Sequence, residues 1–112
     1  GLRLVCGPDG NPIAVHVMDG AFLVSFDVAL KKAYTSVAVK MSTMELSALA
    51  QPGGTFYGVD KMDGGKIVIF GGGVPLKSGD TIIGGLGISG GTGEEDHSLA
   101  EYGLSVLPEI LG

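Results

Sequence analysis

The chain has 112 residues, a formal net charge of −5 and an apolar fraction of 45%. This length suits one domain covering residues 1–112, and the acidic balance argues against a nucleic-acid partner, because phosphate binding needs a basic face. A single cysteine, Cys6, excludes an intrachain disulfide framework and fits a reducing compartment. No apolar run approaches the roughly 20 residues that cross a bilayer, so we expect a cytoplasmic protein without a membrane partner. The mean hydropathy of +0.41 predicts surplus apolar surface, which a homo-oligomer would bury.

Two strands and two helices are predicted in the first half of the chain. The strands cover residues 2–6 and 12–17, and the Pro8-Asp9-Gly10 sequence between them has the chemistry of a hairpin turn. Apolar residues at helical spacing predict a helix over residues 26–40. Ser42 and Glu45 form a capping-box pattern at the start of a shorter second helix, which a Pro-Gly pair ends.

Three more strands and a final helix are predicted in the second half. The strands cover residues 55–59, 66–70 and 81–88, and the helix runs from a capping box at Thr92 to Pro108. The order is therefore β-β-α-α-β-β-β-α. Five strands joined mainly by hairpins predict an α/β (α+β) domain in which helices cover an antiparallel sheet. Gly103, inside the final helix, predicts close packing against that sheet.

Two clusters of glycine, at residues 71–73 and 84–91, stand at the ends of predicted strands. Glycine permits positive φ and a close approach to the backbone, so these clusters predict a recess at the edge of the sheet. Residues 85–90 match the G-x-G-x-x-G dinucleotide pattern, but only one helix follows, and a βαβ unit needs a further strand. An alternative interpretation is that the same helix start binds an anion or a propionate without the full dinucleotide pattern, although Glu94, Glu95 and Asp96 would repel an anion there.

The two histidines, His16 and His97, lack the paired spacing of a metal site. His16 is either a half-buried strand residue bonded to backbone, or an iron ligand or pocket donor. We expect His97 to be solvated and Cys6 to be buried and inert. Asp19 is either a turn residue or a polar contact at a pocket mouth. No triad, catalytic carboxylate pair or metal cluster emerges, so the residues supply no positive case for an enzyme.

Five motifs, spread over nearly the whole chain, carry a resemblance to a known family. In chain order they are Met18-Asp19-Gly20-Ala21 with Ser25, Lys32-Ala33-Tyr34-Thr35, Gln51-Pro52-Gly53, the run from Ile67 to Leu76, and Gly87-Ile88-Ser89-Gly90-Gly91 with Asp96. Together they resemble the signature of the GlcG/HbpS family, and most closely the C-terminal domain of the corrinoid adenosyltransferase PduO.

The resemblance implies a profilin-like fold, with a five-stranded antiparallel sheet and helices on its faces, usually in a homo-oligomer. Relatives normally begin with a long helix before the first strand, and that helix is expected to be absent here. Members bind haem, and some are linked to cobalamin-dependent diol or glycerol utilisation. The adenosyltransferase activity of PduO belongs to a different, N-terminal domain.

We therefore predict a non-catalytic domain that binds a small ligand, with haem or another tetrapyrrole as the ligand. The macrocycle would be enclosed by apolar side chains, its propionates would meet backbone amides, and His16 is the candidate iron ligand. The residues expected to line the site are His16, Met18, Asp19, Lys32, Tyr57, Gly72, Gly73, Pro75 and Ser89. Two alternatives stay open: an oligomeric assembly module without a ligand, and an enzyme that acts on a small metabolite through Asp19 or Cys6.

Overall fold

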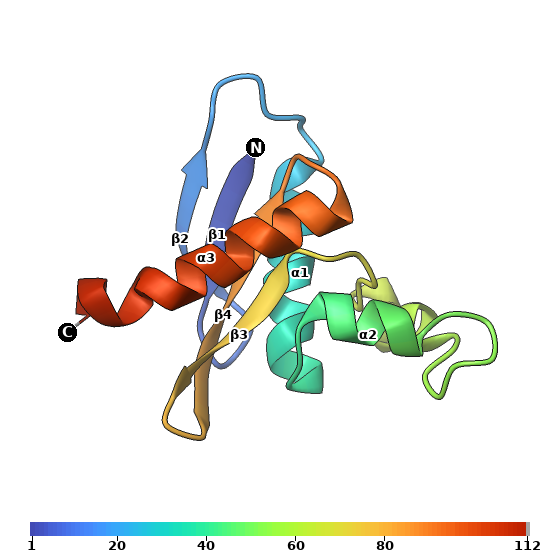
Figure 1. Cartoon of the computed structure of the whole chain (residues 1–112). Helices are drawn as coiled ribbons and strands as arrows, with labels where there is room; N and C mark the ends of the chain where they lie inside the picture. The colour runs from blue at the N-terminus through green and yellow to red at the C-terminus, as the bar shows by residue number, and fades with distance from the viewer. Residues whose placement is uncertain (112) are drawn as a thin grey trace.

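The computed structural model describes residues 1–111, with side chains described up to residue 105. Its four strands form one sheet: β1 (Leu2–Cys6), β2 (Pro12–Val17), β3 (Gly73–Ser78) and β4 (Thr81–Ser89). Their order is β2-β1-β4-β3, and every neighbouring pair is antiparallel (Figure 1). The predicted first hairpin and the predicted strand over residues 81–88 are confirmed, as β1–β2 and β4. Strands β2 and β3 are the two edges of the sheet.

Three α-helices pack around this sheet. Helix α1 (Ser25–Val39) covers one face, α3 (Gly93–Leu111) crosses the other, and α2 (Thr43–Leu49) lies beside the β3 edge. In Figure 1, α3 runs in front of the sheet and α1 behind it, while β2 stands clear of both helices. The predicted α/β class, an antiparallel sheet covered by helices, is confirmed.

The interface between α1 and the sheet depends on small side chains. Ala29 and Ala33 of α1 pack on the buried side chains of β1, which are Leu2, Leu4 and Cys6. On β4, a Cβ at Gly85 would lie 2.5 Å from the carbonyl oxygen of Ala33, and a Cβ at Gly87 would overlap that of Ala29. The backbone of α1 therefore sits directly on the backbone of β4.

The opposite face of β4 packs against α3. Val74, Ile88 and Ala100 form the centre of this second core. A Cβ on Gly103 would stand 3.0 Å from the side chain of Leu86. The close packing predicted for Gly103 is confirmed.

The prediction of five strands is wrong, because two of the predicted strands are not strands. Residues 55–58 form turns that lead into two short 3-10 helices, η1 (Val59–Lys61) and η2 (Asp63–Gly65), and residues 66–70 are irregular. In the irregular segment the amide of Val68 donates to the Thr35 hydroxyl at 2.9 Å, and that hydroxyl donates to the Lys66 carbonyl at 3.3 Å. A side chain of α1 thus takes the place of a neighbouring strand.

The remaining strand of the sheet, β3, was not predicted; it begins at Gly73, the last residue of the first glycine cluster. Pro75 has no backbone N–H to donate, and β3 tolerates it because an edge strand leaves one side unpaired. Four strands, not five, form the sheet.

Both predicted capping boxes are confirmed. The Ser42 hydroxyl accepts from the Glu45 amide at 3.1 Å, and the Thr92 hydroxyl accepts from the Glu95 amide at 3.1 Å. The predicted end of the last helix at Pro108 is wrong, because α3 continues to Leu111. A proline removes one donor from a helix, which here does not stop it.

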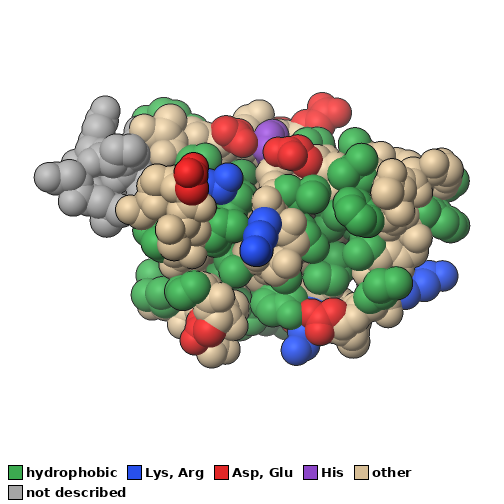
Figure 2. Space-filling view, turned by 90° about the horizontal axis from the view of Figure 1, so that it is seen from below, with side chains coloured by type: hydrophobic (Ala, Val, Ile, Leu, Met, Phe, Trp, Pro, Cys, Tyr) green, Lys and Arg blue, Asp and Glu red, His purple; other side chains and the backbone are tan. Residues whose placement is uncertain are grey.

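The surplus apolar surface predicted from composition is present. Figure 2 shows apolar side chains spread between scattered charges on one face of the molecule. Leu23 is fully exposed at 101%, and its neighbours Phe22 and Val24 are 72% and 60% exposed. No helix among the described residues is long and apolar enough to cross a membrane.

Candidate functional site

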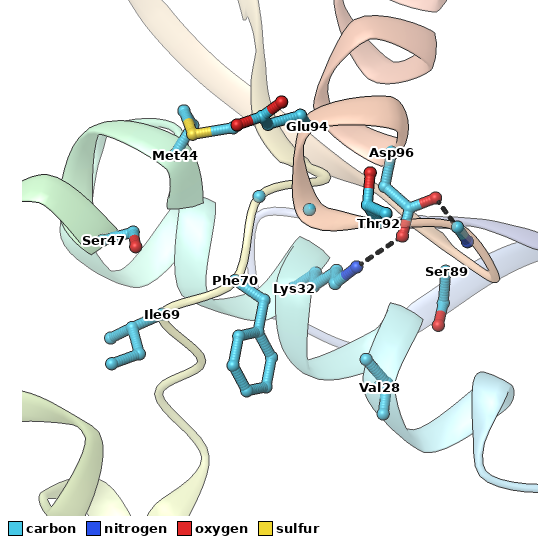
Figure 3. Close-up of a pocket in the computed structure, with 13 residues that line it drawn as sticks. Val28, Lys32, Met44, Ser47, Ile69, Phe70, Ser89, Thr92, Glu94 and Asp96 are labelled. Carbon is cyan, nitrogen blue, oxygen red and sulfur yellow. Dashed lines mark hydrogen bonds and ion pairs between the residues drawn. The ribbon is translucent and has the colours of Figure 1, made fainter.

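The glycine clusters border a large cavity, which we call the Lys32 hollow. It has a volume of about 720 Å³ and lies between α1, α2, the segment 69–71 and the first turn of α3 (Figure 3). Its lining combines four apolar side chains with polar groups and three glycines: Val28, Met44, Ile69, Phe70, Lys32, Ser47, Ser89, Thr92, Glu94, Asp96, Gly71, Gly91 and Gly93.

A buried ion pair borders this hollow. The Lys32 ammonium donates to Asp96 Oδ2 at 3.0 Å and to the carbonyl oxygen of Ile88 at 2.8 Å, and both charged side chains are only 4% exposed. The second carboxylate oxygen of Asp96 accepts from the Gly91 amide at 3.0 Å. This network joins α1, the end of β4 and the start of α3.

Two of the predicted site glycines make room for the ion pair. A Cβ at Gly72 would stand 2.9 Å from the Lys32 ammonium and 2.9 Å from the Cβ of Asp96, and a Cβ at Gly73 would overlap the backbone of Lys32. The φ of Gly72 is +127°, which a residue with a side chain rarely adopts. Gly72 and Gly73 therefore lie packed against Lys32 rather than along the surface of the hollow.

Two polar groups at the hollow have bonding capacity to spare. An ammonium has three hydrogens, and the described residues accept only two of those on Lys32. The Ser89 side chain is 8% exposed and takes part in none of the side-chain hydrogen bonds among the described residues. On the nearby first turn of α3, hydrogen bonds from Thr92 hold the pKa of Glu95 below its usual range.

A second cavity, which we call the His16 trough, lies on the opposite face of the sheet. It has a volume of about 450 Å³ and runs between α3 and the part of β1 and β2 that α3 leaves uncovered. Strand register places His16 of β2 beside Arg3 of β1, and Arg3 beside Ile88 of β4. The other side chains lining the trough are mostly apolar: Val5, Ala14, Val15, Leu76, Leu86, Leu99 and Tyr102.

Both histidines differ from their expected environments. His16 was expected to be half-buried and bonded to backbone if it served only the strand; instead it is exposed, with no hydrogen bond to a described residue, because no helix covers β2. His97, expected to be solvated, is partly buried, and its Nε2 lies 3.6 Å from Glu101. Cys6 is fully buried as predicted, and burial raises the pKa of its thiol.

The structure does not bring the predicted site residues together. Lys32 and Ser89 line the hollow, and His16 lines the trough. Met18 and Asp19 are exposed in the turn after β2. Tyr57, 67% exposed, and Pro75 border neither cavity.

Sequence reasoning missed one pairing and one residue that matter at these cavities. Asp96 belongs to the family motifs, but its pairing with Lys32 over 64 residues of chain has no local signal. Arg3 was not singled out, although alternation along the first hairpin places it on the same face as His16.

Comparison with known proteins gives consistent matches. The family described as haem degrading protein HbpS-like matches residues 4–105. A 15.0 kDa protein of the dhaT–dhaS intergenic region of Citrobacter freundii is 42% identical over 101 residues, which are 90% of this chain and 71% of that protein. The corrinoid adenosyltransferase PduO of Salmonella typhimurium is 47% identical over 98 residues, 88% of this chain. The chain spans only 29% of that PduO.

Among solved structures, the crystal structure of a PduOC–haem complex superposes with a TM-score of 0.88 and 40% identity. The match covers 95% of this chain and 77% of that chain.

Proposed function

Since the chain belongs to the HbpS-like family, we propose that it is a haem-binding domain and that the His16 trough holds the haem. The observation that carries this proposal is the placement of His16 beside Arg3 over an apolar floor. Support also comes from the similar structure of PduOC, which is a complex with haem. Bound haem supplies an iron centre for ligand or electron chemistry.

The donor set of the trough fits haem. The His16 imidazole would hold the haem iron, because histidine is a common protein ligand of haem. Arg3 offers a cation with several N–H donors to a propionate. Val5 and Leu86 would contribute apolar contacts to the macrocycle, and α3 would supply a side wall.

The Lys32 hollow fits haem less well. Among its lining residues only Met44 carries a side chain that commonly ligates haem iron. Its one cation, Lys32, is already paired with Asp96. Glu94 and Glu95 add uncompensated negative charge at the start of α3, which opposes the approach of two propionates.

A haemin titration tests the proposal. The wild-type chain should shift the Soret band of haemin. The variant His16→Ala should lose that shift and bind at least about tenfold more weakly, because a metal–ligand bond is lost.

The variant His97→Ala is the matched control, since it removes the other histidine, which lies on α3 but does not line the trough. It should titrate like the wild type. A wild-type chain that leaves the Soret band unchanged would refute haem binding, whereas an unchanged spectrum in His16→Ala would remove only His16 as ligand.

The relatives suggest a setting for this binding. PduO is named as a corrinoid adenosyltransferase, and the region it shares with this chain is under a third of its length. We therefore propose an accessory, non-catalytic role beside cobalamin-dependent diol or glycerol utilisation. Co-elution of the haem-loaded chain with a corrinoid adenosyltransferase on gel filtration would support this role, and separate elution at micromolar concentration would contradict it.

Exposed apolar surface favours a second candidate, assembly into a homo-oligomer. Phe22, Leu23 and Val24 project from the turn before α1, and Ile13 on the open edge strand β2 is 71% exposed. Apolar surface of this extent is characteristic of interfaces. Light scattering should show an oligomer that Leu23→Glu weakens, and a monomer at high micromolar concentration would exclude it.

A further inference from the structure

The Lys32 hollow has the size and lining of a ligand site that haem does not use. Its volume of about 720 Å³ falls in the range of small-molecule pockets, which are mostly apolar with a few placed polar groups. We propose that this hollow is a second binding site, for a small uncharged molecule with a carbonyl oxygen and an apolar body.

Spare hydrogen-bond donors define the polar end of the ligand. One hydrogen of the Lys32 ammonium has no acceptor among the described residues, although the side chain is 4% exposed. The ammonium therefore has one hydrogen left to donate to an acceptor in the hollow. The Ser89 hydroxyl, which also lines the hollow and has no partner among the described residues, is a second donor there.

The charged side chains around the hollow favour an uncharged oxygen as the acceptor on the ligand. Asp96 already neutralises Lys32, so an added carboxylate would stand beside a neutral pair with no cation of its own. Glu94 lines the hollow and Glu95 follows it, and both carry negative charge. Repulsion by these side chains disfavours an anion, while a ketone, amide or ester oxygen accepts the same hydrogen bonds without that cost.

Apolar side chains define the rest of the ligand. In Figure 3, Val28 and the ring of Phe70 lie below Lys32, and Ile69 lies to the left of Phe70. Phe70 is 60% exposed, so an apolar group laid against it would remove its surface from water.

This site is separate from the His16 trough. Ser89 borders the hollow and its neighbour Ile88 borders the trough, and side chains alternate between the two faces of a strand. The sheet therefore divides the two cavities, and both can be filled at once.

An isosteric pair of probes tests the proposal: 3-phenylpropanamide, which is uncharged, and 3-phenylpropanoate, which is anionic. In NMR titrations of the ¹⁵N-labelled chain, the amide should shift the signals of Ser89 and Gly91 and saturate in the millimolar range, which is usual for a ligand of this size. The carboxylate should bind at least about tenfold more weakly.

Variants and competition locate the effect. Ser89→Ala should weaken binding of the amide about three- to tenfold, because one hydrogen bond is lost. Ser98→Ala, which changes an exposed serine of α3, should leave it unchanged. Saturating haemin should not displace the probe.

Several outcomes would overturn the inference. It fails if neither probe shifts signals at the hollow, if both bind equally, or if Ser89→Ala binds like the wild type. Displacement of the amide by haemin would also overturn it, by showing that the two ligands share one site. The first three results leave haem binding at His16 untouched, which the Soret titration of the wild type and His16→Ala decides; displacement would also count against the trough as the haem site.

Discussion

Replacing Asp96 by asparagine should destabilise the chain strongly. The substitution keeps the shape of the side chain but leaves the Lys32 ammonium, 4% exposed, without a counter-ion. At 3.0 Å the direct attraction is about 5 kcal/mol for an effective dielectric constant of about 20. Breaking one side of a buried pair costs about 3–5 kcal/mol, a large part of the roughly 5–15 kcal/mol that holds a domain folded.

Urea and thermal unfolding measure this effect. At about 4 °C per kcal/mol for a chain of this length, Asp96→Asn should lower the melting temperature by roughly 12–20 °C. The double variant Lys32→Met/Asp96→Leu removes both charges and should recover part of the loss.

A second lysine of α1 provides the matched control. Lys31 pairs with Asp27 at 3.0 Å on the exposed side of the helix, and such pairs contribute less than about 0.5 kcal/mol. Asp27→Asn should therefore change stability little. If Asp96→Asn costs no more than Asp27→Asn, the reasoning about the buried pair is wrong.

Two further predictions concern a glycine and the cysteine. Gly72→Ala should lower the free energy of unfolding by more than about 2 kcal/mol, because the new Cβ would lie 2.9 Å from the Lys32 ammonium and the φ of residue 72 is +127°. The control Gly58→Ala, at φ +93° with no atom within 4 Å of the new Cβ, should lower it by only about 1 kcal/mol. Equal losses for the two variants in urea unfolding would contradict this. Burial raises the pKa of the Cys6 thiol, so its contribution to stability is fully present below the ordinary thiol pKa and is lost as pH rises through the raised value. Ellman's reagent should label Cys6 at pH 8 only in denaturant. Rapid labelling of the native chain would show that the thiol is accessible to solvent, contrary to its burial.

Local patterns were enough to predict most of the elements. The turn chemistry at Pro8 to Gly10 located the first hairpin, and the capping boxes at Ser42 and Thr92 located two helix starts. These signals act over three or four residues, so a single sequence contains them. The stripe of apolar residues that predicted α1 has the same local character.

The errors came from contacts between distant residues. The β-branched run at residues 67–69 has the composition of a strand, but Thr35 of α1 bonds its backbone instead of a strand partner. The reverse happened at β3, where Pro75 and the glycines suggested a bend and β4 recruited them as an edge strand. No local pattern could settle either case.

The candidate site was predicted in part for the same reason. Glycine clusters indicated a recess, and the Lys32 hollow lies beside them. The ion partner of Lys32 lies 64 residues further along the chain, and His16 and Lys32 lie on opposite faces of the sheet. Only the tertiary arrangement separates these residues into two cavities.

The contact between α1 and the glycines of β4 restricts how such a chain can be altered by selection or engineering. A Cβ at Gly85 or Gly87 would displace α1. Substitution at these two glycines therefore cannot be used to change the position of Lys32, which α1 carries, relative to the sheet. If the Lys32 hollow binds a ligand as proposed, its preference would be changed at the lining residues Met44, Ser47, Ile69 and Phe70. A library of variants made to change that preference should vary these four residues and keep Gly85 and Gly87.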